Sequence, residues 1–151
     1  SAVLSIMKKE GLNADQMSDL LNKESGVKGI SGVSSDIREV EAGIREGNER
    51  CKLAMEMYDY RIKKYIGSYA AVMGGVDIVV FTAGVGEHQW DVRQGAIEDL
   101  EFMGIKVDTE KNKKNFGEEE IISTPDSKVK VVIVPTDEEL LIASDTLDLV
   151  K

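Results

Sequence analysis

Apolar residues recur at helical spacing along most of the first half of the chain. Residues 2–9 predict a short helix, and a second helix follows it, with Asn13 or Asp15 as its cap. A loop rich in glycine and serine, residues 27–35, is expected next. The first quarter of the chain is therefore predicted to contain helices and no strand.

Two further helices are predicted before the middle of the chain. Ser35 is the expected N-cap of the first, whose opening turn carries Asp36 and Glu39. The second is the longest periodic stretch, residues 48–73, which ends at two glycines. Its apolar residues cover much of the helix circumference, so we expect burial on more than one side.

The second half of the chain alternates between strand and helix patterns. Continuous β-branched runs predict buried strands, and glycine, proline and aspartate mark the ends of the segments. The expected order is a strand at 77–81, a glycine turn at 82–88, a helix at 91–100 capped by Asp91, a short strand at 102–107, a lysine-rich helix opened by Asp108 or Thr109, strands at 120–123 and 129–134, and a helix at 136–149 capped by Thr136.

This alternation predicts an α/β fold with a small, mainly parallel sheet flanked by helices. The confident strands are few and come late in the sequence. Such a sheet is small for so long a buried helix, so we expect that amino-terminal partner strands are missing from this chain.

Composition excludes several classes of function. The formal net charge of the 151 residues is −9, which would repel a phosphate backbone, so nucleic-acid binding is not expected. Cys51 is the only cysteine, so the chain can form no internal disulfide, which fits a reducing compartment. No apolar run approaches the length that spans a bilayer, so we expect no membrane segment and a cytoplasmic protein.

The first motif that could carry chemistry is the turn TAGVGEH after the strand at 77–81. Gly84 and Gly86 can adopt positive φ and allow a ligand to approach the backbone closely. The start of the following helix directs amide groups outward, which suits a phosphate or a nucleotide. The alternative is a tight connection that binds nothing, because Gln89 stands where a dinucleotide fingerprint has its third glycine.

Two other motifs lie at predicted helix starts. In SSDIREVE, Arg38 could stack on a base or contact phosphate, or Asp36 and Arg38 could be ordinary surface charges of a capped helix. In PTDEELL, a carboxylate after a buried strand could hold Mg²⁺. The alternative is a capping box formed by Thr136 and Glu139, which would still leave Glu138 free for a metal.

Taken together, in this order and at these separations, the three motifs resemble one family. DIVVFTAGVGEH, GISGVSSDIREVE and VVIVPTDEELLIASDT are similar to the carboxyl-terminal part of the acetokinase family, within the actin-like, sugar-kinase and Hsp70 superfamily. The similarity runs through nearly the whole chain. It implies an RNase H-like (actin-like ATPase) fold, of which residues 1–151 would be the carboxyl-terminal portion of the second, nucleotide-binding domain.

The resemblance also implies an activity, cofactors and site residues. Members transfer phosphate from ATP to acetate, giving ADP and acetyl phosphate, and they use Mg²⁺. The D-x-R segment would contact the adenine side, the glycine turn would wrap the nucleotide, and a glutamate would bind Mg²⁺. The corresponding residues are Asp36, Ile37 and Arg38, then Gly84, Val85, Gly86, Glu87 and His88, and finally Glu138. His88 and Asp137 stand where the family usually has asparagine.

The residues that surround the acyl substrate and the transferred phosphoryl group in this family do not match any part of the chain. We therefore expect no catalytic residue here, a carboxyl-terminal fragment that is inactive alone, and acetate or acetyl phosphate bound through the missing half. A homodimer is expected, since members dimerise through this half. The alternatives are a propionate or butyrate kinase fragment, and a non-catalytic interaction module.

Overall fold

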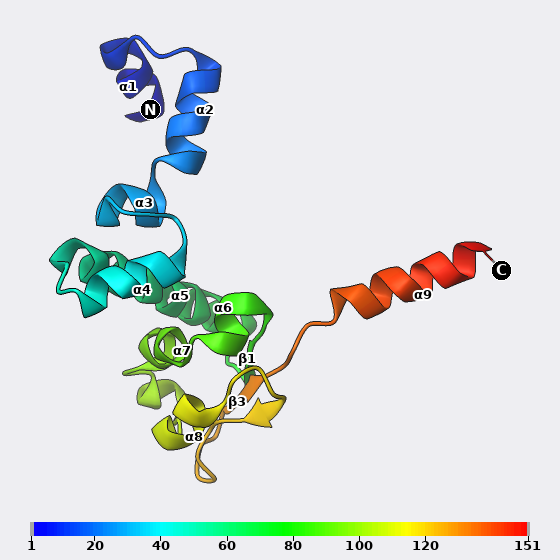
Figure 1. Ribbon diagram of the computed structural model, residues 1–151. Coiled ribbons are helices and arrows are strands. Elements are labelled where there is room, and N and C mark those ends of the chain that lie inside the picture. Colours follow the sequence, from blue (N-terminus) through cyan, green and yellow to red (C-terminus); the bar gives the residue numbers. More distant parts are fainter. Residues whose placement is uncertain (1, 151) are drawn as a thin grey trace. The chain divides into compact units, whose positions relative to one another are not determined.

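The computed structural model describes residues 2–150 of the chain. The chain divides into two compact units, with the boundary between Tyr60 and Arg61. This boundary lies inside the long helix α5 (Glu49–Met73), which was predicted over residues 48–73. Figure 1 colours the chain from blue at the amino-terminal end to red at the carboxyl-terminal end.

The first unit is helical, as the sequence pattern predicts. Its helices before α5 are α1 (Ala2–Glu10), α2 (Ala14–Lys23), α3 (Gly26–Ser31) and α4 (Ile37–Arg45). Asn13 caps α2 through a capping box, in which its side chain and that of Gln16 each accept a bond from the other's backbone. Helix α3 occupies much of the stretch that was expected to be a loop.

The second unit contains the sheet and the remaining helices. Its elements are β1 (Ile78–Phe81), α6 (Ala83–His88), α7 (Trp90–Ile97), a 3₁₀ turn (Glu101–Met103), α8 (Thr109–Lys114), β2 (Glu120–Ile121), β3 (Lys130–Ile133) and α9 (Glu138–Val150). Strands β1 and β3 lie side by side in Figure 1, although three helices separate them in the sequence.

The sheet is small and mixed. Its strand order is β1-β3-β2, with β1 and β3 parallel and β2 antiparallel to β3. In the parallel pair, Ile78 lies opposite Lys130 and Phe81 lies opposite Ile133. The predicted α/β class and the strands around 77–81 and 129–134 are confirmed, and the longer pair is the parallel one.

One face of this sheet forms the hydrophobic core of the second unit. Side chains on that face pack against α7 and against the segments that follow it. The buried members are Phe81, Ala96, Ile97, Leu100, Ile105, Ile122, Val129, Val131 and Ile133. On the opposite face, Ile78 and Val80 of β1 remain about half exposed, at 53% and 51%.

Three predictions for α7 and the segment that follows it are wrong. The helix expected to reach residue 100 ends at Ile97, because Glu98 is extended and Asp99 has a positive φ of 60°. The strand expected at 102–107 is replaced by the 3₁₀ turn and single bridges, because Gly104 has a φ of +88° and interrupts the extended path. Asp91 does not cap α7 either, since its side chain only accepts a bond from the adjacent Val92 amide.

Helices α5 and α9 each expose several large apolar side chains. Helix α9 has no buried residue, and Leu140, Leu141 and Ile142 are all exposed. Tyr65 and Tyr69 of α5 are also exposed and stack on each other, so the predicted burial of α5 on more than one side is not found in this chain. Across residues 2–150, no helix has the length and apolar composition needed to cross a membrane.

Candidate functional site

The glycine-rich segment after β1 folds as a short helix rather than as an open turn. Thr82 is the N-cap of α6, and Gly84 and Gly86 both have ordinary negative φ values within it. The prediction of positive φ at these glycines is therefore wrong. The left-handed position is Ala83, with φ of 59°, which is a strained conformation for a residue with a Cβ.

The two glycines of α6 serve different purposes. A Cβ on Gly86 would lie 3.2 Å from the carbonyl carbon of Phe81, so glycine allows α6 to pack tightly against the end of β1. A Cβ on Gly84 would meet nothing within 4 Å, and this residue is exposed. The surface of α6 at Gly84 is thus open to a ligand, whereas the surface at Gly86 is used for packing.

Glu87 directs its carboxylate toward the protein. Its Oε1 accepts hydrogen bonds from the backbone N–H and the side-chain Oγ1 of Thr136, each at 2.9 Å, and the residue is only 8% exposed. These two bonds are the main reason why the pKa of Glu87 lies below its usual range. His88, the next residue, is exposed, and its ring contacts the loop at Gly117.

Arg93 of α7 also holds α6 in place, and the sequence pattern did not identify it. Its guanidinium donates to the backbone oxygens of Gly86 at 2.9 Å and Glu87 at 2.7 Å. It also donates to Asn112 Oδ1 at 2.7 Å and to the backbone oxygens of Asn112 and Asn115. Arg93 is fully buried, and this burial lowers its pKa.

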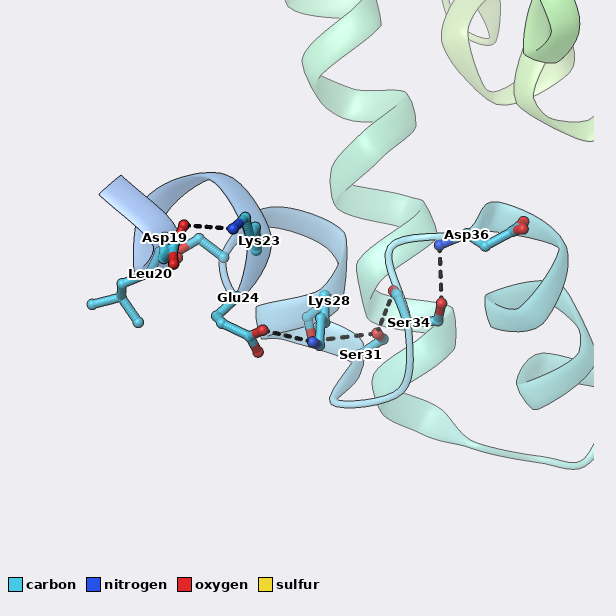
Figure 2. Close-up of polar contacts among 9 residues, drawn as sticks. Asp19, Leu20, Lys23, Glu24, Lys28, Ser31, Ser34 and Asp36 are labelled. Atoms are coloured by element: carbon cyan, nitrogen blue, oxygen red, sulfur yellow. Dashed lines mark hydrogen bonds and ion pairs between the residues drawn. The ribbon is translucent and has the colours of Figure 1, made fainter. Parts of the chain in front are cut away.

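The D-x-R segment lies at the start of α4 in the first unit. Asp36, not Ser35 as predicted, is the N-cap, because its Oδ1 accepts the backbone N–H of Arg38 at 2.9 Å. Figure 2 shows the polar contacts that precede it, including the Asp36 N–H donating to Ser34 Oγ at 3.1 Å. The N-cap of α4 therefore lies one residue later than predicted from the sequence.

Asp36 and Arg38 also form an ion pair through their side chains. Arg38 Nε donates to Asp36 Oδ1 at 3.0 Å, and Nη2 donates to Oδ2 at 2.6 Å. This bidentate bond, together with the capping bond, lowers the pKa of Asp36 to about 2. The Arg38 side chain is 80% exposed, so its outer face is free to meet a ligand.

We expect the Arg38→Ala variant to raise the pKa of Asp36 from about 2 part of the way toward its ordinary value of 3.8. The rise should be partial, because the backbone N–H of residue 38 still donates to Asp36. The carboxyl ¹³C shift of Asp36, followed against pH, measures this change.

Because the folded pKa is the lower one, Asp36 stabilises α4 above pH 3.8, and that stabilisation is lost as the pH falls toward 2. Arg45→Ala, at the far end of α4, is the control, and an unchanged titration in Arg38→Ala would contradict the assignment.

The third motif begins α9, and its cap differs from the predicted one. Asp137 Oδ1 accepts the backbone N–H of Leu140 at 2.9 Å, so Asp137 is the cap and Thr136 is not. The predicted capping box between Thr136 and Glu139 is therefore wrong, because the Thr136 hydroxyl is already bonded to Glu87. Glu138, the first residue of α9, is exposed.

Glu138 fits a magnesium ion only in one particular form of coordination. Over residues 2–150, no three His, Cys, Asp or Glu side chains form a group that could hold a metal ion. Mg²⁺ is commonly bound by one or two carboxylates, with water and phosphate oxygens as the other ligands. A single exposed carboxylate at Glu138 satisfies that requirement if a bound phosphate supplies part of the shell.

Two of the three predicted site segments are therefore joined directly. The contact between Glu87 and Thr136 connects α6, with Gly84, Val85, Gly86 and His88, to the turn that leads into Glu138. Asp36, Ile37 and Arg38 belong to the first unit. That the D-x-R segment faces the same ligand as α6 stays a prediction.

Comparison with known proteins agrees with the motif analysis. The sequence profile of the Acetokinase family matches residues 1–144. Acetate kinase of Bacteroides thetaiotaomicron is 65% identical over 150 residues, which is 99% of this chain and 38% of that protein.

Solved structures resemble the chain in fold as well. The crystal structure of Porphyromonas gingivalis acetate kinase has a TM-score of 0.92 at 57% identity, over 99% of this chain and 38% of the other. A propionate kinase from Francisella tularensis has a TM-score of 0.83 at 32% identity, over 94% of this chain and 36% of the other.

The chain spans a little over one third of the length of these relatives. Its α/β fold is that of their actin-like ATPase domain, over the part that is covered. The match extends over nearly all of the sequence and includes the D-x-R segment, the glycine-rich segment after β1 and the PTDEELL segment. On this basis the chain belongs to the acetokinase family.

Proposed function

We propose that this chain supplies the nucleotide-binding part of an acetate kinase, which interconverts acetate and ATP with acetyl phosphate and ADP. The observation that carries the proposal is the 65% identity to an acetate kinase over 99% of the chain. The relatives at 57% and 65% identity are acetate kinases, whereas the propionate kinase is 32% identical, as is one further acetate kinase; the preference for acetate therefore rests on the more similar relatives.

The proposed roles follow from the chemistry of the exposed groups. Arg38, with its guanidinium face open, contacts the adenine side together with Asp36 and Ile37. The open surface of α6 at Gly84 and Val85 borders the nucleotide, and His88 adds a polar contact beside it. Glu138 binds Mg²⁺, which neutralises phosphate charge when bound.

The proposal assigns no catalytic residue to this chain. Phosphoryl transfer depends mainly on positioning and on charges placed around the transferred group. Arg38 and Glu138 are nucleotide and metal contacts, and the groups that would surround the acyl substrate are proposed to lie outside these residues. We propose that the complete enzyme is a cytoplasmic homodimer.

Binding calorimetry on the 151-residue chain tests the proposal. We expect ADP to bind in the presence of Mg²⁺ with a Kd on the order of 1 mM, and Glu138→Gln to weaken this binding. Glu139→Gln is the matched control, because it removes a neighbouring charge from the same helical turn without touching the proposed metal ligand. A coupled assay should detect no acetate-dependent ADP formation.

Three outcomes would contradict parts of this proposal. If ADP with Mg²⁺ produces no binding signal, the chain is better described as a non-catalytic interaction module. If Glu138→Gln and Glu139→Gln weaken binding equally, Glu138 is not the specific metal ligand. Acetate-dependent turnover above that of a heat-inactivated sample would show that the chain contains the catalytic groups.

A further inference from the structure

Glu87 joins two segments that lie 49 residues apart in the sequence. Both hydrogen bonds from Thr136, one from the backbone N–H and one from Oγ1, converge on the same oxygen, Glu87 Oε1. The carboxylate is almost completely buried, at 8% exposure of the residue. Oε1 of Glu87 is therefore occupied by hydrogen bonds within the protein.

This contact is stronger than an ordinary surface hydrogen bond. An ionised carboxylate forms shorter and stronger bonds with N–H and O–H donors than a neutral acceptor does. Glu87 is ionised at neutral pH, as glutamate normally is, and the bonds from Thr136 lower its pKa further. Both hydrogen bonds from Thr136 are therefore made to a charged acceptor.

The segment between β3 and α9 is fixed at two points. Val134 N–H donates to Phe81 O at 2.9 Å, which extends the β1–β3 pairing by one bond. Thr136 is then bonded to Glu87, and Asp137 caps α9 immediately afterwards. Glu138 follows directly, so its backbone position is set relative to α6 by these contacts.

We propose that Glu87 is a positioning residue, which holds the turn carrying the metal ligand Glu138 against the nucleotide-binding helix α6. This inference rests on the proposed function. It separates Glu87 from its neighbours Val85 and His88, since its carboxylate acts on Thr136 and not on the nucleotide. An anionic carboxylate turned toward the phosphates would in any case repel them.

Positioning has a consequence that a merely structural contact lacks. If Mg²⁺ is bound by Glu138 and by the phosphates of ADP, the two ligands favour each other, and the strength of that coupling depends on Glu87 holding Glu138 beside α6. Such coupling is reciprocal, and typical values change affinity by about 5-fold or more. Loss of the contact should reduce the coupling while ADP keeps its own contacts with α6.

The experiment measures ADP affinity with and without Mg²⁺ by calorimetry, and amide hydrogen exchange at Thr136, on the 151-residue chain. In the unsubstituted chain we expect Mg²⁺ to improve ADP affinity by at least about 5-fold. In Glu87→Ala this gain should fall below about 2-fold, ADP affinity without Mg²⁺ should change by less than about 2-fold, and the Thr136 amide should lose its protection.

Further variants keep the test informative if Glu87→Ala folds poorly. Glu87→Gln retains an acceptor oxygen and should restore much of the coupling and of the Thr136 protection. Thr136→Val removes only the hydroxyl donor, so both measurements should be intermediate. Glu119→Gln, an exposed carboxylate in the same unit, is the control and should match the unsubstituted chain.

The outcomes separate this inference from the proposed function. If Glu87→Ala lowers ADP affinity equally with and without Mg²⁺, Glu87 contacts the nucleotide and the positioning role is overturned. Unchanged coupling in Glu87→Ala would also overturn it, with the proposed function intact. If the unsubstituted chain binds no ADP at all, the proposed function fails and this role falls with it, while Thr136 protection still reports the contact.

Discussion

Arg93→Leu is expected to lower the free energy of unfolding of the second unit by about 3–5 kcal/mol. Leucine fills part of the volume of the arginine stem but donates no hydrogen bond. Five acceptor contacts would be lost, and they involve the oxygens of Gly86, Glu87, Asn112 and Asn115. Acceptors that stay buried after losing their donor incur a desolvation cost.

Urea unfolding followed by tryptophan fluorescence measures this loss. Trp90 is the only tryptophan, and its backbone oxygen accepts a bond from Asn112 Nδ2, so it reports on the same region. Arg93→Lys keeps the charge with fewer donors, and its stability should be intermediate. Arg61→Leu, at an exposed position of the same unit, should change stability by less than about 0.5 kcal/mol. A loss below about 1 kcal/mol in Arg93→Leu would contradict the role assigned to this side chain.

Arg93 also illustrates what sequence patterns cannot predict. Within residues 91–100, an arginine followed by glutamine and two residues after Asp91 is typical of a solvated helix surface. Its partners, Asn112 and Asn115, lie about 20 residues downstream, in and just after a lysine-rich helix that has the same surface character. No local periodicity connects these positions. Their association becomes visible only when α6, α7 and α8 are packed together.

Local chemistry, by contrast, predicted most of the regular elements. The β-branched runs predicted the positions of β1 and β3, although β1 is buried on its core face only and not on both faces as the continuous run suggested. The caps Asn13 and Asp108 are also confirmed, because each satisfies an amide within its own first turn. At these two positions the deciding contact lies within three residues of the cap, although the same local reasoning placed the caps of α4 and α9 one residue too early.

The errors in the candidate site have distant causes. Thr136 was expected to cap α9, but its hydroxyl is bonded to Glu87, and Asp137 takes the capping role instead. Gly86 was predicted to allow a positive φ and the close approach of a ligand, but it is the close approach of α6 to Phe81 that requires a glycine. The residue types of the site could thus be predicted, whereas the partner of each side chain could not.

Two isoleucines of the sheet, the buried Ile133 and the exposed Ile78, allow a second large effect on stability to be tested. Ile133→Ala is expected to lower the free energy of unfolding of the second unit by about 2–5 kcal/mol, because Ile133 is fully buried in its core and alanine leaves a cavity. Ile78→Ala makes the same chemical change on β1, the neighbouring parallel strand. Ile78 is 53% exposed, so we expect a loss of about 1 kcal/mol or less, mainly from the lower strand preference of alanine.

Urea unfolding of both variants, followed through Trp90, provides the comparison. A several-fold larger loss for Ile133→Ala than for Ile78→Ala would support a sheet whose core lies on one face. Equal losses would contradict that arrangement, because an exposed isoleucine has little contact area to lose. In that case another part of an assembly must cover Ile78 and Val80, and sedimentation of the unsubstituted chain would then have to reveal self-association at the same concentration.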